Sequence, residues 1–163
     1  MVRSFITIIA LYISVTCNSQ TALPSIALKS TDGDEIRLSD FSALKKPLII
    51  SFWATYCNPC LQEFEAFGDL YMEWKKEMDF EFIAISIDDS RSAAKVKSLA
   101  SGRNWPFVVL IDENQDVKRA MNVNDIPFIF LFDKNGKYVY RHTGYLPGDE
   151  YILLKELRKI SNE

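Results

Sequence analysis

This sequence contains few histidines, few cysteines and few long apolar runs. Each of these features argues against certain classes of function. The 163 residues include one His and three Cys, whereas a structural zinc site takes about four His and Cys ligands. The chain has 19 Lys and Arg and 22 Asp and Glu, which give a net charge of -3. Binding of nucleic acid needs a concentrated basic face, and the pattern of Lys and Arg shows none. The composition therefore argues against a zinc site and against nucleic acid as a partner.

The first residues of the chain differ from the rest. Arg3 gives a positive start, residues 5–13 are almost wholly apolar, and residues 14–19 are small and polar. This order is typical of a secretory signal peptide, and the apolar run is shorter than the roughly 20 residues that span a membrane. We therefore predict a signal peptide over residues 1–19 and an exported protein of the periplasm or cell envelope. The alternatives are a lipid-modified Cys17 and an uncleaved membrane anchor.

Removal of this leader would leave Cys57 and Cys60 as the cysteines of the mature chain. Such a pair is not the pattern of a small domain held together by a disulfide framework. Apolar residues make up 48% of the sequence and charged residues 25%, as in ordinary globular proteins. No internal repeat or low-complexity run follows the leader. Residues 20–163 are thus expected to form one domain.

Strand-like and helix-like segments alternate along this domain. Two short strands joined by a turn come first, strand–helix units follow, and a hairpin with a final helix ends the chain. The expected strands are residues 25–28, 36–38, 47–54, 80–87, 107–111, 127–132 and 137–141, and the expected helices are residues 58–78, 90–101, 113–121 and 148–160. This order predicts an α/β fold with a mixed central sheet, helices on both faces and an N-terminal β-hairpin extension.

The motif Cys57-Asn58-Pro59-Cys60 lies where the first buried strand meets the first long helix. Free N–H groups and the dipole at a helix N-terminus favour an anion, so we expect the pKa of Cys57 to lie below the free-thiol value of about 8.5. Pro59 fits the first turn, where its missing N–H is not needed. Cys60, one turn further on, would resolve a mixed disulfide formed at Cys57. The alternatives are an inert disulfide and half of a zinc site.

Residues 52–60, Phe-Trp-Ala-Thr-Tyr-Cys-Asn-Pro-Cys, resemble the thioredoxin active-site motif. With the hairpin that ends at residues 38–41, the pair Ile126-Pro127 and the turn at residues 133–136, nearly the whole mature chain resembles the exported TlpA-like branch of the thioredoxin-fold family. The resemblance implies a thioredoxin-like fold in which Pro127 is cis and lies beside the cysteines, and in which the backbone of Ile126 pairs with the substrate. From the residues alone, a trans proline that opens an edge strand is the alternative.

The sequence departs from the thioredoxin pattern in its acidic residues. Ser51 stands where thioredoxin has a buried Asp, and the resemblance to the TlpA-like branch points instead to Asp89. A partly buried Asp89 would have a raised pKa and could accept the proton of Cys60. The alternative is that Asp88 or Asp89 caps the helix that follows. Glu63 matches an acid common in the branch, but we interpret it as part of a solvated helix face.

The aromatic side chains and the histidine are not predicted to take part in the chemical step. Tyr56 replaces the usual Trp before the first cysteine and could present a flat surface to a substrate. Trp53 and Trp74 are expected in the core, and His142 is expected to be structural or exposed. The residues predicted to contact substrate are Tyr56, Asn58, Pro59, Ile126 and Pro127.

The predicted function is thiol–disulfide exchange with protein substrates outside the cytoplasm, with Cys57, Cys60 and Asp89 as the catalytic residues. The reductase direction rests on the resemblance and not on the residues. The expected partners are proteins with disulfides or thiols and an upstream electron donor, either a membrane or a soluble thiol protein. We expect a monomer that binds neither a metal nor another cofactor.

Three other functions compete with this prediction. A peroxiredoxin-like thiol peroxidase usually has a Thr-x-x-Cys site, whereas Thr55 stands only two positions before Cys57. A non-catalytic binding module of the same fold would not need both cysteines. A copper carrier would need a wider cysteine spacing with added histidines, and His142 is the single His of the chain.

Overall fold

The structure, a computed structural model, describes residues 23–161. The predicted signal peptide over residues 1–19, with Cys17, lies outside the described residues. The described part forms one seven-stranded sheet with helices on both faces, so the predicted fold class is confirmed.

The elements follow the predicted order with shifts of a few residues at their ends. The strands are β1 (Ala27–Ser30), β2 (Glu35–Arg37), β3 (Leu48–Trp53), β4 (Glu81–Ser86), β5 (Val108–Ile111), β6 (Phe128–Phe132) and β7 (Tyr138–Thr143). The helices are the 3-10 helix η1 (Leu38–Leu44) and the α-helices α1 (Asn58–Glu77), α2 (Ala93–Gly102), α3 (Asp116–Ala120) and α4 (Asp149–Ser161). The 3-10 helix was not predicted, and α2 begins three residues later than expected because residues 90–92 form a turn.

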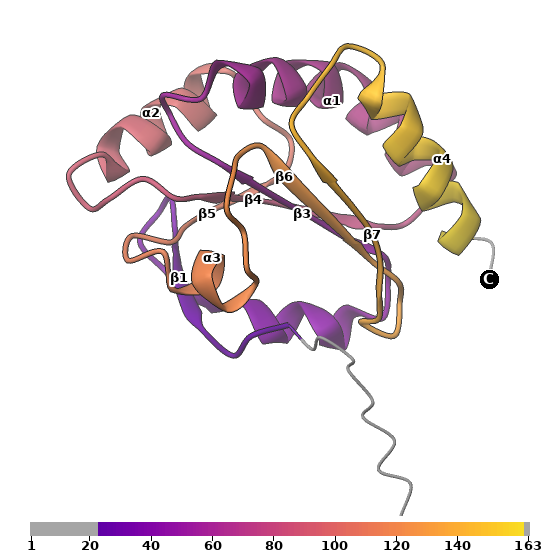
Figure 1. The fold of residues 1–163 in the computed structure, drawn as a ribbon, viewed down its shortest axis with the longest axis horizontal. Coiled ribbons are helices and arrows are strands. Elements are labelled where there is room, and N and C mark those ends of the chain that lie inside the picture. The colour runs from indigo at the N-terminus through magenta and orange to yellow at the C-terminus, as the bar shows by residue number, and fades with distance from the viewer. Residues whose placement is uncertain (1–22, 162–163) are drawn as a thin grey trace, which may run out of the picture.

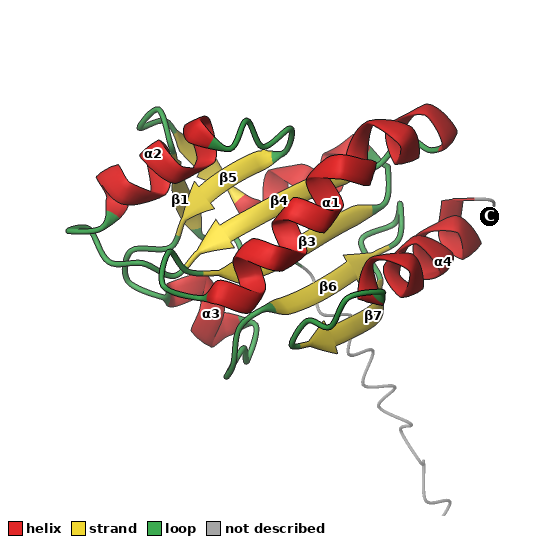
Figure 2. Ribbon diagram, turned by 90° about the horizontal axis from the view of Figure 1, so that it is seen from above, coloured by secondary structure: helices red, strands yellow, loops and turns green. Residues whose placement is uncertain are grey.

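The strands lie in the order β2-β1-β5-β4-β3-β6-β7 (Figure 2). Strands β3, β4 and β5 are parallel neighbours, and β6 and β7 continue the sheet in antiparallel fashion. The predicted N-terminal hairpin is β1 paired with β2, and it extends the sheet by pairing β1 antiparallel with β5. Strand β3 therefore lies inside the sheet, between β4 and β6, and all six of its residues are buried, as its near-continuous apolar sequence predicts.

Helices α1, α2 and α4 cover one face of the sheet, and α3 with η1 covers the other (Figure 1). Side chains of β3 alternate between these faces. Trp53 packs edge-to-face on Phe64 of α1, whereas Phe52 packs on Phe130 of β6. Because Ser51 lies two residues before Trp53, it faces α1 as well, which places a small polar side chain beneath that helix.

An aromatic cluster holds α1 on the sheet. Phe64 contacts four other rings edge-to-face, and burial of one such side chain contributes about 1.5–3 kcal/mol. The rings around Phe64 are Trp53, Phe82, Trp105 and Phe107. Trp53 and Trp74 are both buried, so their predicted core positions are confirmed. None of the helices within residues 23–161 has the length and apolar character to cross a membrane.

Candidate active site

Cys57 and Cys60 form a disulfide at the N-terminus of α1, with their Cα atoms 5.3 Å apart. Cys57 is the N-cap residue, and its Sγ accepts a hydrogen bond of 3.3 Å from the backbone N–H of Cys60. Pro59 occupies the first turn, as predicted. Cys57 keeps 7% of its surface exposed, whereas Cys60 is fully buried. An incoming sulfur can therefore reach Cys57 and not Cys60.

The bond Ile126-Pro127 is cis, which confirms that prediction. Strand β6 begins directly after Pro127, where Phe128 pairs with Phe52 near the end of β3. The dipeptide therefore lies at the same edge of the sheet as the loop that carries Cys57. The carbonyl of Pro127 accepts a 2.8 Å hydrogen bond from the N–H of Gly144, which attaches the loop after β7 to this edge.

The residues predicted to contact substrate differ in how far they reach solvent. Tyr56 is 68% exposed, Asn58 and Pro59 are exposed, Ile126 is half-buried and Pro127 is buried. Tyr56 therefore presents a large aromatic surface directly beside the accessible sulfur. The contact of these residues with substrate stays a prediction.

Asp88 is a buried carboxylate that organises the loop before the cysteines. It accepts hydrogen bonds of 2.8 Å from both the N–H and the hydroxyl of Thr55, and one of 2.7 Å from the hydroxyl of Ser86. Thr55 lies two residues before Cys57, so Asp88 fixes the path of the chain into α1. With three donors around it, this carboxylate serves the loop and does not cap α2.

Asp89 lacks the burial and the raised pKa that a proton relay needs. Its carboxylate is 43% exposed, pairs with Arg91 at 2.6 Å and accepts a hydrogen bond from the N–H of Ser92, the residue before α2. The hydrogen bond from Arg91 lowers the pKa of Asp89. The structure thus corrects the expected environment of Asp89 and fits the capping alternative, because its side chain reaches the start of the next helix.

Glu63 has the environment that Asp89 lacks, and the prediction of a solvated face was wrong for it. Its side chain is 1% exposed, and its Oε2 accepts a 2.9 Å hydrogen bond from the hydroxyl of Ser51. Burial raises the pKa of Glu63 to about 8, with a further contribution from the charge of Asp149. Positions three residues apart in a helix share a face, so Glu63 lies on the same side of α1 as Cys60.

The sequence carries a signal for the burial of Glu63. Glu63 lies three residues after Cys60 and four before Phe67, and both of those residues are buried. A charged residue at such spacing falls on the buried face. The unexpected Ser51 on a strand of otherwise apolar residues is the second half of the signal, because a buried carboxyl needs a donor.

Within residues 23–161, no group of three or more His, Cys, Asp and Glu side chains has an arrangement that could hold a metal ion. This edge of the sheet brings together the sulfurs of Cys57 and Cys60 and the buried carboxyls of Glu63 and Asp88.

Comparison with known proteins identifies a family. The model of the AhpC/TSA family matches residues 20–141. The thiol-disulfide oxidoreductase ResA of Geobacillus kaustophilus is 32% identical over 127 residues, which are 78% of this chain and 70% of that protein.

Two solved structures place the fold in the same group. A thioredoxin-like protein from Porphyromonas gingivalis is 45% identical and superposes with a TM-score of 0.77 over 90% of this chain and 95% of its own. Peroxiredoxin Q of Xanthomonas campestris, at 18% identity, a TM-score of 0.73 and coverage of 86% and 94%, shares the fold alone. The chain therefore belongs to the AhpC/TSA family, among its thioredoxin-like thiol–disulfide oxidoreductases of the ResA and TlpA type.

Proposed function

We propose that this chain reduces disulfides of proteins outside the cytoplasm, with Cys57 as the attacking sulfur and Cys60 as the resolving one. The unequal exposure of the two cysteines carries the proposal, because Cys57 keeps 7% of its surface exposed and Cys60 is fully buried. The export of the protein rests on the leader in residues 1–19, and the reductase direction rests on the resemblance to the TlpA-like branch.

The reaction moves two electrons from the dithiol to the substrate. The thiolate of Cys57 attacks one sulfur of the substrate disulfide, so that a mixed disulfide forms and the other substrate sulfur leaves as a thiolate. Cys60 then loses its proton and attacks the Sγ of Cys57. This second step releases the remaining substrate sulfur, which takes up a proton, and leaves the Cys57–Cys60 disulfide seen in the structure.

Glu63 is suited to accept the proton of Cys60 in the second step. Its pKa of about 8 lies close to the value of about 8.5 for a free thiol, and proton transfer is most efficient between groups of matched pKa. In the reverse half of the cycle, an upstream thiol protein reduces the disulfide and a protonated Glu63 returns the proton to Cys60. Its burial keeps the proton from exchanging freely with solvent.

Trapping of mixed disulfides tests the roles of the two cysteines. Cys60→Ala should accumulate mixed disulfides with substrate proteins at Cys57, because the resolving sulfur is gone. The matched variant Cys57→Ser should accumulate none. Non-reducing electrophoresis with mass spectrometry of the linked peptides gives the answer. Adducts at Cys60 in the Cys57→Ser variant would reverse the assignment.

The peroxidase alternative is tested by the same protein. The hydroxyl of Thr55 donates to Asp88 at 2.8 Å, and a hydroxyl committed in this way does not help to bind a peroxide. The purified dithiol form should therefore reduce a protein disulfide much faster than it consumes hydrogen peroxide. Rapid peroxide consumption would favour the peroxidase.

A further inference from the structure

Ser51 places a hydroxyl against the carboxyl of Glu63 from a strand inside the sheet. Its backbone pairs with Ala84 of β4 on one side and with Ile129 of β6 on the other. Ser51 is fully buried, and Glu63 is 1% exposed. The hydroxyl therefore has a fixed position beneath α1.

This hydroxyl donates to one oxygen of Glu63. The 2.9 Å hydrogen bond ends on Oε2, and within residues 23–161 neither Oε1 of Glu63 nor the hydroxyl of Ser51 has another hydrogen-bond partner. A hydroxyl carries a single hydrogen, and a buried donor without an acceptor costs free energy. The hydrogen of Ser51 is therefore committed to Oε2.

The commitment of Ser51 decides which oxygen of Glu63 can carry a proton. An ionised carboxylate accepts at both oxygens, whereas a protonated carboxyl has one O–H donor and one carbonyl acceptor. A proton on Oε2 would leave the hydrogen of Ser51 without its acceptor. A proton on Oε1 keeps that hydrogen bond, because Oε2 is then the carbonyl oxygen of the acid.

We propose that Ser51 is a positioning residue that holds Oε2 of Glu63, so that Oε1 is the atom that accepts the proton of Cys60 and later returns it. This inference deepens the proposed function and rests on its proton step. Ser51 donates to Oε2 in both protonation states, so Glu63 can take up and release the proton without turning its side chain.

The same hydrogen bond bears on the acidity of Glu63. Burial raises the pKa of Glu63, the hydrogen bond from Ser51 acts in the opposite sense, and the charge of Asp149 on α4 adds to burial. From the loop before α4, burial raises the pKa of Tyr145 to about 12, with contributions from Glu150 and Glu63. Asp149, Tyr145 and Glu150 stay the same in the variants below, so their contributions cancel when the variants are compared.

The first measurement is independent of catalysis. In the oxidised protein, the carboxyl carbon of Glu63 is followed by NMR as the pH is raised. Ser51→Ala should raise the midpoint of Glu63 by ~1 pH unit or more, because the carboxylate loses its donor. Ser51→Thr keeps a hydroxyl on the strand and should return the midpoint towards that of the parent.

Ser86→Ala is the matched control. It removes an equally buried hydroxyl, which donates to Asp88 at 2.7 Å, and it should leave the midpoint of Glu63 in place. An unchanged midpoint in Ser51→Ala overturns the role of Ser51. So does an equal rise in Ser51→Thr or in Ser86→Ala.

Infrared spectroscopy identifies the oxygen that carries the proton. The C=O stretch of protonated Glu63 is assigned by its loss in Glu63→Gln. The stretch should lie at lower frequency in the parent than in Ser51→Ala, because a hydrogen bond to the carbonyl oxygen weakens the C=O bond. Equal frequencies would place the proton on Oε2 and overturn the inference.

The last measurement connects the hydrogen bond to the reaction. The rate at which Cys60 releases a mixed disulfide is recorded against pH, and in Ser51→Ala the rising limb should move to higher pH together with the NMR midpoint. A midpoint that rises while the rate profile stays in place overturns the proton step of Glu63, and the role of Ser51 with it. Absence of adducts at Cys57 in Cys60→Ala would instead overturn the proposed function itself.

Discussion

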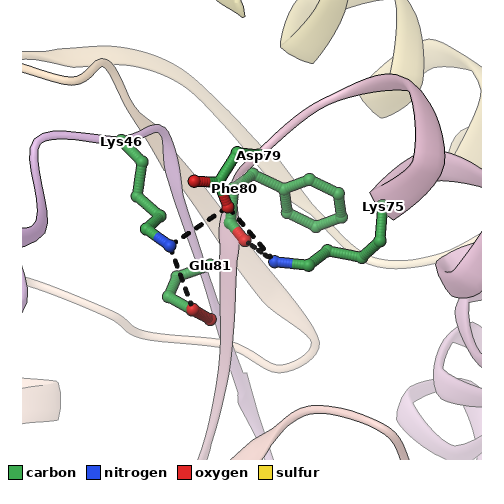
Figure 3. Close-up of polar contacts among 5 residues, drawn as sticks. All are labelled: Lys46, Lys75, Asp79, Phe80 and Glu81. Atoms are coloured by element: carbon green, nitrogen blue, oxygen red, sulfur yellow. Dashed lines mark hydrogen bonds and ion pairs between the residues drawn. The ribbon is translucent and has the colours of Figure 1, made fainter.

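The acidic side chains near the two ends of the parallel strands β3 and β4 have opposite environments. At their amino ends, acids and bases meet in solvent: Lys46 lies 3.0 Å from Asp79 and 3.7 Å from Glu81, and Lys75 of α1 lies 3.6 Å from Asp79 (Figure 3). Lys75 also reaches the carbonyl and the ring of Phe80. Each carboxylate at this end has a cation beside it.

At the carboxyl ends of the same strands, the carboxyl groups of Glu63 and Asp88 are buried. Glu63 and Asp88 accept hydrogen bonds from hydroxyl and backbone N–H groups. Within residues 23–161, neither has an ion pair with Lys, Arg or His. An ion pair in solvent contributes little to stability, whereas burial without a cation raises the pKa of Glu63 to about 8, a value suited to proton transfer.

The stability contributed by the acids at the two ends of these strands should therefore change with pH in opposite directions. The hydrogen bond from Lys46 lowers the pKa of Asp79, so the stability that this pair contributes is present above the ordinary pKa of Asp and is lost as the pH falls. Burial raises the pKa of Glu63 from 4.5 to about 8. Its contribution is present at low pH and is lost as the pH rises from 4.5 to about 8, because the unfolded chain releases the proton first.

Glu63→Gln should have the largest effect on stability, because it removes the ionisable group from the buried site. The amide can still accept from Ser51, and it cannot ionise. At about pH 9 the variant should be more stable than the parent, by an amount of the order of 4 kcal/mol. Near pH 4 the two proteins should be nearly equal. Urea unfolding at a series of pH values measures the difference.

The same variant should slow the release of mixed disulfides at alkaline pH, because Cys60 loses its proton acceptor. Glu65→Gln, an exposed carboxylate two residues further on that pairs with Arg103, is the matched control and should leave both the stability profile and the rate unchanged. Equal pH profiles for the parent and Glu63→Gln would show that Glu63 does not titrate with a raised pKa.

Asp88→Asn should have the next largest effect. Replacement of one carboxylate oxygen by an amide nitrogen removes an acceptor from the donors of Thr55 or Ser86, and a buried unsatisfied donor costs about 1–3 kcal/mol. Since Thr55 precedes Cys57 by two residues, attack by Cys57 should slow as well. Unfolding curves and the rate of mixed-disulfide formation measure the two effects. Full stability and full rate in the variant would contradict the role of Asp88 in fixing the loop.

Asp89→Asn should have a smaller effect on the reaction than Asp88→Asn. Asp89 is exposed and paired with Arg91, so the variant should release mixed disulfides at the parental rate. Stopped-flow mixing of the dithiol form of each variant with a protein disulfide, followed through formation and release of the mixed disulfide, is the measurement. A slower release in Asp89→Asn than in Asp88→Asn would restore Asp89 as the proton relay.

Local patterns in the sequence were sufficient for most of the fold. A near-continuous apolar run predicted β3, and the motif Cys57-Asn58-Pro59-Cys60, with its proline between the cysteines, predicted the start of α1. The resemblance to thioredoxins predicted the cis bond at Pro127. Each of these features depends on neighbouring residues or on a motif, so no knowledge of distant contacts was needed.

Features that depend on distant parts of the chain were missed. The buried Glu63 accepts its hydrogen bond from Ser51, twelve positions earlier on β3. Asp88 and Asp89 are adjacent in sequence, yet one is buried and the other exposed because the chain turns between them towards α2. The alignment of acids with a family pattern could not separate the two. Only the path of the backbone assigns each carboxylate its partner.

Asp79→Asn should have the smallest effect, because its carboxylate is 73% exposed. A surface ion pair contributes less than about 1 kcal/mol, and ~1 M salt screens most of it. The loss of stability should therefore be small in low salt, smaller still in high salt, and absent below the pKa of Asp79, where the parent is neutral as well. A double-mutant cycle with Lys46→Gln isolates the pair. If Asp79→Asn cost as much as Asp88→Asn and resisted salt, solvent exposure would not be what separates the two ends of the sheet.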